Sequence, residues 1–243
     1  MKCILLCAGY ATRLFPLTEN FPKALLKVGE KSILDYIVTE VNNIDQVDEI
    51  YLITNAKYTP HFEKWAEEKN NIKNIKVIND QTYSNDDRLG AIGDIMYTLD
   101  KEKIDDDVLI IAGDNLFTFD LRGFVKYFEE KKSPVICVKP EEDREQLKRF
   151  GIVELDENMK LTGFEEKPAN PKSNYVSYAE YIYPRETLPL FKTYIEEGNL
   201  SDNSGEFVAF LHKRVDTYAY QFEGECYDIG THDSLAQVNE IFS

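Results

Sequence analysis

The chain has 243 residues, of which 43% are hydrophobic, and carries 28 basic against 44 acidic side chains, a formal net charge of −16. This length and composition predict a globular protein with a substantial core, and no apolar run suits a signal peptide or a membrane span. The acidic balance argues against a nucleic-acid partner, because such partners require a net basic face that releases counterions.

The four cysteines are too scattered for a zinc site and too few for a disulfide scaffold: Cys3, Cys7, Cys137 and Cys226. Reduced thiols and a cytoplasmic protein are therefore expected. Residues 1–31 depart from the acidic average, with five basic against two acidic side chains, a local charge of +3. A basic segment in an acidic protein indicates a small anionic ligand such as a phosphate, unless surface lysines have clustered by chance.

Five short apolar runs predict strands covered on both faces, at residues 3–8, 49–54, 75–80, 107–113 and 134–139. Helical patterns lie between them. Ser32 and Asp35 form a capping box before one helix, and Thr59 followed by Pro60 predicts the start of another. This alternation up to about residue 140 predicts a Rossmann-like α/β fold, a mostly parallel sheet flanked by helices.

The alternation of predicted strands and helices ends at about residue 140. Two strands are predicted around a turn at Glu157 and Asn158, and a tyrosine-rich run follows at 173–183. The remaining elements expected are helices at 185–197 and 204–213, a strand at 216–222, and a helix after Thr231. We expect one domain over residues 1–243, with a core at 1–140 and a small antiparallel α+β subdomain at 141–243.

The stretch "LLCAGYATRLFPLTENFPKAL", residues 5–25, turns from a predicted strand into a loop with small and basic residues. Ligands in open parallel sheets lie beyond the carboxyl ends of strands. Gly9 would let the backbone approach a phosphate, and Arg13 and Lys23 could neutralise a triphosphate. The loop matches neither GxGxxG nor GxxxxGK[ST], so alone it fits a tight turn with a surface arginine equally well.

Together with four later motifs, this loop resembles the sugar-1-phosphate nucleotidyltransferases, and most of all the glucose-1-phosphate thymidylyltransferases. The later motifs are "AGDNLF" (112–117), "FGIVELDE" (150–157), "FEEKPANPKSNY" (164–175) and "YDIGTHDSL" (227–235). The five stand in the family's order along nearly the whole chain. The resemblance implies the nucleotide-diphospho-sugar transferase fold, with residues 1–140 binding the nucleotide and 141–243 binding the sugar phosphate.

The resemblance also implies roles for individual residues. It makes Arg13 and Lys23 catalytic, and Asp114 and Asp228 ligands of Mg²⁺. The residues implied in nucleotide binding are Ala8, Gly9, Tyr10, Ala11, Thr12 and Gly90, with Asn79 or Asp80 beside the base. Arg88, a charge in the same segment that the motifs do not explain, is a further candidate for contact with the triphosphate. Those implied in sugar-phosphate binding are Gly151, Glu166, Lys167 and Tyr178.

The reaction so implied joins a nucleoside triphosphate and a sugar 1-phosphate into a nucleotide sugar and pyrophosphate. A phosphate monoester is largely ionised near neutral pH, since its second pKa is about 6, so no general base is required. Catalysis then consists of aligning two polyanions and neutralising their charge. Basic and small residues in the opening loop suit that task.

Two features depart from the family pattern. Ala11 stands where a second glycine is usual, which restricts the backbone. Tyr178 and Ala179 stand where the thymidylyltransferase pattern has a small hydroxyl residue and a glycine near the sugar. Tyr178 therefore predicts either an altered acceptor pocket or a side chain that packs in the core.

Several alternatives remain at this stage. The resemblance favours dTTP or UTP with a glucose 1-phosphate-like acceptor, and the runner-up is a cytidylyltransferase acting on a phosphorylated polyol, choline or another alcohol phosphate. A metal-dependent glycosyltransferase fits less well, because Asp114 is followed by Asn115 and Leu116 rather than completing an Asp-x-Asp motif. A non-catalytic homologue fits less well because the implied catalytic and metal residues are all present. The sequence leaves a homo-oligomer open.

Overall fold

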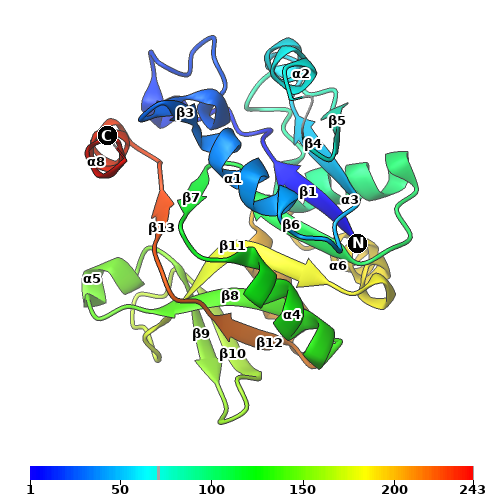
Figure 1. Ribbon diagram of the computed structural model, residues 1–243. Coiled ribbons are helices and arrows are strands. Elements are labelled where there is room, and N and C mark those ends of the chain that lie inside the picture. The colour runs from blue at the N-terminus through cyan, green and yellow to red at the C-terminus, as the bar shows by residue number, and fades with distance from the viewer. Residues whose placement is uncertain (70–71, 243) are drawn as a thin grey trace.

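A computed structural model describes residues 1–69 and 72–242 (Figure 1). Its main sheet has nine strands: β1 (Lys2–Leu6), β4 (Glu49–Thr54), β5 (Asn74–Asn79), β6 (Val108–Ala112), β8 (Val135–Pro140), β9 (Gly151–Leu155), β10 (Leu161–Glu166), β11 (Tyr175–Tyr183) and β12 (Tyr218–Gln221). The helices are α1 (Ile33–Asn42), α2 (Thr59–Glu67), α3 (Gly90–Glu102), α4 (Leu121–Lys131), α5 (Arg144–Leu147), α6 (Pro189–Glu196), α7 (Ser204–Leu211) and α8 (His232–Ile241). Short 3₁₀ helices span Thr12–Leu14, Lys23–Leu25 and Arg185–Thr187.

The first half of the sheet is parallel, in the order β6-β1-β4-β5. Leu5 of β1 lies opposite Leu52 of β4 and Ile111 of β6, and all three side chains are fully buried. One core cluster packs this sheet against α1, α2 and α4, and a second packs its other face against α3, α6 and α7. The α/β fold with helices on both faces is thus confirmed.

The second half of the sheet is antiparallel and is organised around β11. This strand pairs with β6, β8 and β9, and β9 continues through a hairpin into β10. The hairpin predicted around Glu157 and Asn158 is therefore confirmed. Strand β12 adds a parallel pair with β8.

Local signals set several helix ends. Ser32 and Asp35 form the predicted capping box of α1, with the Ser32 amide donating to Asp35 Oδ2 at 3.0 Å and the Asp35 amide to Ser32 Oγ at 3.1 Å. Thr231 caps α8 as predicted. The start of α2 differs by one residue, because Tyr58 occupies the cap position and Thr59 is already helical.

Two small sheets escaped the sequence analysis: β2 (Lys27–Val28) with β3 (Lys31–Ser32), and β7 (Asn115–Phe117) with β13 (Cys226–Asp228). In the second sheet Asp228 lies opposite Asn115, the residue that follows Asp114. Figure 1 shows β13 running beside β7 on its way to α8. This pairing brings together two motifs that lie far apart in the sequence.

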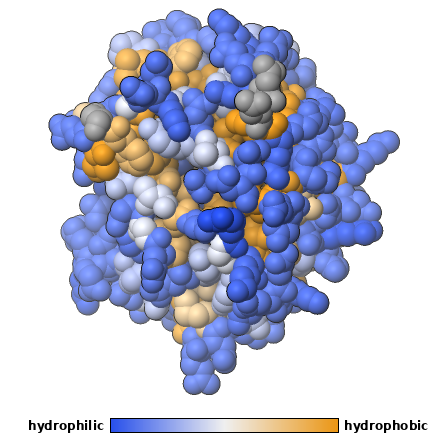
Figure 2. Space-filling model, viewed as in Figure 1, coloured by the Kyte–Doolittle hydropathy of each residue, from blue (hydrophilic) through white to orange (hydrophobic). Residues whose placement is uncertain are grey.

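The surface seen in Figure 2 is mostly hydrophilic, and apolar residues appear mainly around the middle of that face and near its upper edge. Within residues 1–69 and 72–242, no helix combines the length and the apolar character that crossing a membrane would require.

Candidate active site

A cleft of about 490 Å³ opens at the carboxyl ends of β1 and β6, where ligands of parallel sheets bind. Three groups of side chains and loops line it. The first is the loop after β1 (residues 6–9 and 11–13), together with Lys23 and Ala24. The second is the start of α3 and the segment before it: Arg88, Gly90, Ala91 and Asp94. The third comes from later strands and loops: Ala112, Gly113, Asp114, Ala179, Asp202, Ser204 and Gly230.

In the loop after β1, the backbone is accessible at Gly9 and is held by hydrogen bonds at Ala11. A Cβ added to Gly9 would meet no atom within 4 Å, so the chain is free there for a close ligand approach. Ala11 adopts the left-handed conformation with a φ of 47°, and its carbonyl accepts hydrogen bonds from the Thr18 hydroxyl at 2.8 Å and the Leu14 amide at 3.0 Å. The restricted backbone expected at Ala11 thus takes the form of a strained, left-handed conformation. These two hydrogen bonds stabilise it.

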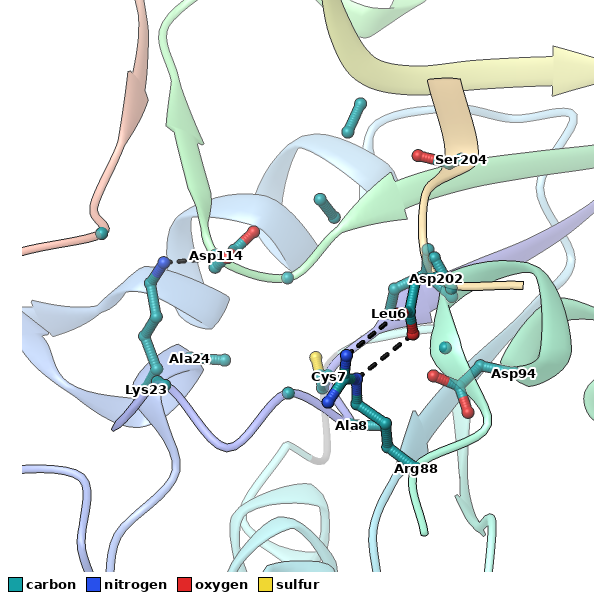
Figure 3. A pocket seen from close by; sticks show the side chains of 18 of the residues that line it. Leu6, Cys7, Ala8, Lys23, Ala24, Arg88, Asp94, Asp114, Asp202 and Ser204 are labelled. Atoms are coloured by element: carbon teal, nitrogen blue, oxygen red, sulfur yellow. Dashed lines mark hydrogen bonds and ion pairs between the residues drawn. The ribbon is translucent and has the colours of Figure 1, made fainter. Parts of the chain in front are cut away.

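Lys23 lies between the two aspartates that the sequence singled out. Its Nζ is 2.8 Å from Asp114 Oδ2 and 3.8 Å from Asp228 Oδ1. The lysine side chain is 9% exposed, whereas the aspartate side chains are 45% and 49% exposed. Figure 3 shows Lys23 reaching Asp114 at one side of the cleft. One cation therefore balances two carboxylates that remain open to solvent.

The donor set at this point fits a magnesium ion. Mg²⁺ prefers oxygen ligands, takes only one or two carboxylates from the protein, and fills its remaining positions with water and phosphate oxygens. Asp114 and Asp228 supply two such carboxylates. No cluster of three or more His, Cys, Asp or Glu side chains suited to a metal occurs among the described residues.

Arg13 completes the charged end of the cleft. A Cβ added to Gly230 would lie 3.1 Å from Arg13 Nη2 and 3.5 Å from Asp228 Oδ1, so the guanidinium approaches the turn that carries Asp228. Gly230 leaves the space that this approach requires. The structure thus brings the four residues with implied catalytic and metal roles, Arg13, Lys23, Asp114 and Asp228, to one end of the cleft.

At the other end, α3 begins beside residues from the segment before α7. Arg88 forms a two-pronged ion pair with Asp202, at 3.2 Å from Nε to Oδ1 and 2.9 Å from Nη2 to Oδ2. The backbone amides of Ala91 and Ile92 donate to the carbonyls of Asp202 and Ser201. Asp202 therefore balances the charge of Arg88, and its segment borders the cleft.

A second cavity of about 220 Å³ adjoins the first and shares Ala112, Asp114, Ala179 and Ser204 with it. All four predicted sugar-phosphate residues line it, together with Asp228: Gly151, Glu166, Lys167 and Tyr178. Lys167 Nζ lies 3.4 Å from Glu166 Oε1, and its side chain is 61% exposed. The two cavities meet at Asp114, where two ligands could react.

Gly151 and Tyr178 play packing roles that the sequence did not fully indicate. A Cβ on Gly151 would lie 2.5 Å from Phe164 Cζ and 3.0 Å from Glu166 Oε2, so this glycine makes room for those side chains. The Tyr178 ring packs against Phe150 and Phe222, with centroids 5.9 and 5.3 Å apart. Tyr178 therefore joins the core and lines the cavity at once.

Of the predicted nucleotide-binding residues, Tyr10 and Asn79 line neither cavity. Tyr10 is buried, and its ring lies 5.9 Å from that of Tyr58. The Asn79 side chain accepts the Gln81 amide at 2.8 Å in the turn after β5. The predicted residues that line the first cleft are Ala8, Gly9, Ala11, Thr12, Arg13, Lys23, Arg88, Gly90 and Asp114.

Sequence reasoning missed several polar residues at the two cavities, among them Asp94, Asp202, Ser204 and Arg149. A signal existed for Asp94, because it interrupts the apolar pattern of "AIGDIM" in a predicted helix. Burial and the neighbouring Asp80 raise the pKa of Asp94 to about 8. No comparable signal marks Asp202, which lies in a polar loop.

The model of the nucleotidyl transferase family matches residues 2–242. The chain is 32% identical over 241 residues to the bifunctional protein GlmU of Methanocaldococcus jannaschii, covering 99% of this chain and 54% of that protein. It is 28% identical over 266 residues to the glucose-1-phosphate adenylyltransferase of Clostridium novyi, covering 98% and 66%. The chain spans about half to two thirds of the length of these relatives.

A solved structure of a candidate glucose-1-phosphate thymidylyltransferase from Bacillus anthracis, in complex with a sucrose, has a similar fold. Its TM-score is 0.80 at 25% identity, and the match covers 100% of this chain and 95% of that one. Because the family model extends over nearly the whole chain, this protein belongs to the nucleotidyl transferase family.

Proposed function

We propose that this protein transfers the nucleotidyl group of a nucleoside triphosphate to a sugar 1-phosphate. The observation that carries this proposal is the bridge from Lys23 to Asp114 and Asp228 at the junction of two cavities. A site for two phosphorylated ligands needs a balanced charge centre where they meet. Two of these relatives have names that refer to glucose 1-phosphate, which supports a hexose 1-phosphate as the acceptor.

In the proposed reaction, a phosphate oxygen of the acceptor attacks the α-phosphorus of the triphosphate. A new P–O bond forms, the bond to the β-phosphate oxygen breaks, and pyrophosphate leaves with the electron pair. Arg13 and Lys23 would neutralise the triphosphate and the charge that grows on the leaving group. The open backbone at Gly9 would let the phosphates lie close to the chain.

Asp114 and Asp228 would hold Mg²⁺, which supplies charge neutralisation and alignment of phosphate oxygens when bound. Lys23, whose amine lies within 4 Å of both carboxylates, would contact phosphate oxygens at the same point. Lys167 would hold the acceptor phosphate, and Glu166 would accept hydrogen bonds from sugar hydroxyls.

We further propose that residues 1–140 contribute most of the nucleotide site and residues 141–243 most of the acceptor site, within one domain. The predicted preference for dTTP or UTP depends on the resemblance alone. The relatives include proteins named for adenylyl and for thymidylyl transfer, so their names favour no single base.

The test is a matrix of five nucleoside triphosphates against sugar 1-phosphates and alcohol phosphates such as phosphocholine, read as pyrophosphate release with and without Mg²⁺. We expect release only when a triphosphate and a phosphorylated acceptor are both present. Strongest release with an alcohol phosphate would favour the cytidylyltransferase alternative. If no pair releases pyrophosphate, or if the protein instead consumes a nucleotide sugar as a glycosyl donor, the proposal is wrong.

A further inference from the structure

A second pair of aspartates lies behind the cleft, and nothing in the reaction above uses it. Asp80 follows β5 and is 3% exposed, while Asp94 lies in the second turn of α3 and is 6% exposed. The Asp80 Oδ1 atom accepts hydrogen bonds from the Thr82 amide at 2.7 Å and the Thr82 hydroxyl at 2.8 Å. Asp80 Oδ2 and Asp94 Oδ1 are buried without any hydrogen-bond partner among the described residues.

Each of the two buried carboxyl groups acts on the pKa of the other. In the described part of the chain neither forms an ion pair with a lysine, arginine or histidine. Burial raises the pKa of both groups, that of Asp94 to about 8. Burial and a neighbouring carboxylate both disfavour a second negative charge, which favours one proton on the pair near neutral pH. With that proton held between them, the rest of the Asp94 carboxyl group can act only as a hydrogen-bond acceptor.

Asp94 projects into the cleft at the end remote from the charged centre. Figure 3 shows its carboxyl group pointing from α3 into the cleft, across from Lys23 and Asp114. The nearby cation Arg88 is already neutralised by Asp202. A triphosphate would therefore lie toward Arg13 and Lys23, which leaves the Asp94 end of the cleft for the nucleobase.

We propose that Asp94, supported by Asp80, reads the edge of the nucleobase and favours a base that carries an exocyclic amino group. This inference depends on the proposed function, which supplies the nucleotide. Cytosine and adenine present an amino donor where uracil and thymine present a carbonyl oxygen. An acceptor at Asp94 pairs with the amino group, and it repels the carbonyl oxygen or leaves it unpaired.

The experiment measures kcat/KM for CTP, ATP, GTP, UTP and dTTP with a fixed acceptor, and also the Kd of each nucleotide by calorimetry without acceptor. In the unaltered protein the best amino-bearing nucleotide should exceed UTP and dTTP at least tenfold in both quantities. Asp94→Asn adds an amide donor that can face a carbonyl oxygen, so it should reduce this ratio at least tenfold, with the KM of the acceptor unchanged.

Asp80→Asn is the matched comparison. Its amide can donate to Asp94, which remains an acceptor, so the preference for an amino-bearing base should persist. If Asp94→Asn does not fold, Asp94→Ser removes the carboxyl group with a smaller side chain and should reduce the ratio as well.

Preference of the unaltered protein for UTP or dTTP, or an unchanged ratio in the Asp94 variants, overturns the inference. Nucleotide binding with the expected preference but no pyrophosphate release would sustain the inference and count against the proposed reaction. Absence of binding by any nucleotide would overturn both.

Discussion

Two pairs of aspartates each contribute one residue to the lining of the cleft, Asp114 and Asp94, and the pairs differ in their surroundings. Asp114 and Asp228 are about half exposed and share Lys23, whereas Asp80 and Asp94 are almost fully buried and form no ion pair in the described chain. Solvent and a nearby cation stabilise a carboxylate, so the first pair can exchange its lysine for another cation. Burial without a cation favours the protonated form, so the second pair is suited to hydrogen bonding. Aspartates in these two environments thus differ in their chemistry, although the residue type is the same.

The largest effect should follow from altering the exposed pair. Asp114→Asn and Asp228→Asn each keep the side-chain shape but remove one negative charge. We expect kcat/KM to fall at least ~100-fold, on the order of 3 kcal/mol of transition-state stabilisation, with little change in melting temperature. Asp216→Asn, at an exposed ion pair with Lys160, should leave activity unchanged. An unaltered dependence on magnesium concentration in Asp228→Asn would contradict a metal role.

The behaviour of buried carboxyl groups can also be tested at Glu180, which lines neither cavity. Its side chain is fully buried, its Oε1 lies 3.4 Å from Asn115 Nδ2, and burial raises its pKa to about 8. A raised carboxyl pKa stabilises the folded protein fully at pH values below the unfolded pKa, and this contribution is lost as the pH rises toward 8.

Glu180→Gln should abolish this loss of stability with rising pH, because glutamine does not titrate. The free energy of unfolding of the unaltered protein, relative to Glu180→Gln, should fall by roughly 3 kcal/mol between pH 4.5 and 8. Urea denaturation at four pH values measures it, and Glu186→Gln, at an exposed position, serves as the control. Parallel pH profiles for the unaltered protein and Glu180→Gln would mean that Glu180 is ionised despite its burial.

A smaller effect is expected at the second cavity, where the cation is exposed rather than enclosed. The Lys167 side chain is 61% exposed, and among the described residues it forms an ion pair with Glu166 alone. Lys167→Met should raise the KM of the acceptor about tenfold and leave that of the triphosphate unchanged. Lys172→Met, at an exposed position of the same loop, should change neither constant. Equal rises in both constants would assign Lys167 to both substrates.

The smallest effect concerns the backbone of the opening loop. Ala11 has a φ of 47°, which glycine adopts without steric strain. Ala11→Gly removes the strain and adds flexibility to the unfolded chain, so we expect a net gain of about 0.5 kcal/mol and a rise in melting temperature of ~1–2 °C. A lower melting temperature would show that the bonds from Thr18 and Leu14 already remove the strain.

The sequence predicted the parts of the fold that depend on local patterns. Each of the five apolar runs coincides with a strand to within one or two residues, and the capping box at Ser32 marks the start of α1. The short strands β7 and β13 were missed, because three-residue strands carry no periodic signal. Their pairing depends on long-range contacts that a local pattern does not encode.

The residues of the candidate site likewise include some that the sequence predicted and some that it did not. Motifs identified Arg13, Lys23, Asp114 and Asp228, because the chemistry requires those residue types. Asp202 and Ser204 could not be predicted, since they reach the cleft only through the packing of their segment against α3. The raised pKa of Asp94 depends on its burial and on Asp80, which follows β5 and is distant from α3 in the local pattern.

The pairing of β13 with β7 also bears on how the protein is made. Lys23 and Asp114 are synthesised well before Asp228, and chains begin to fold from the N-terminal side during synthesis. A nascent chain can therefore complete the strands from β1 to β6 while the charged centre still lacks one carboxylate. The charged centre is therefore complete only after β13 has been synthesised and has paired with β7.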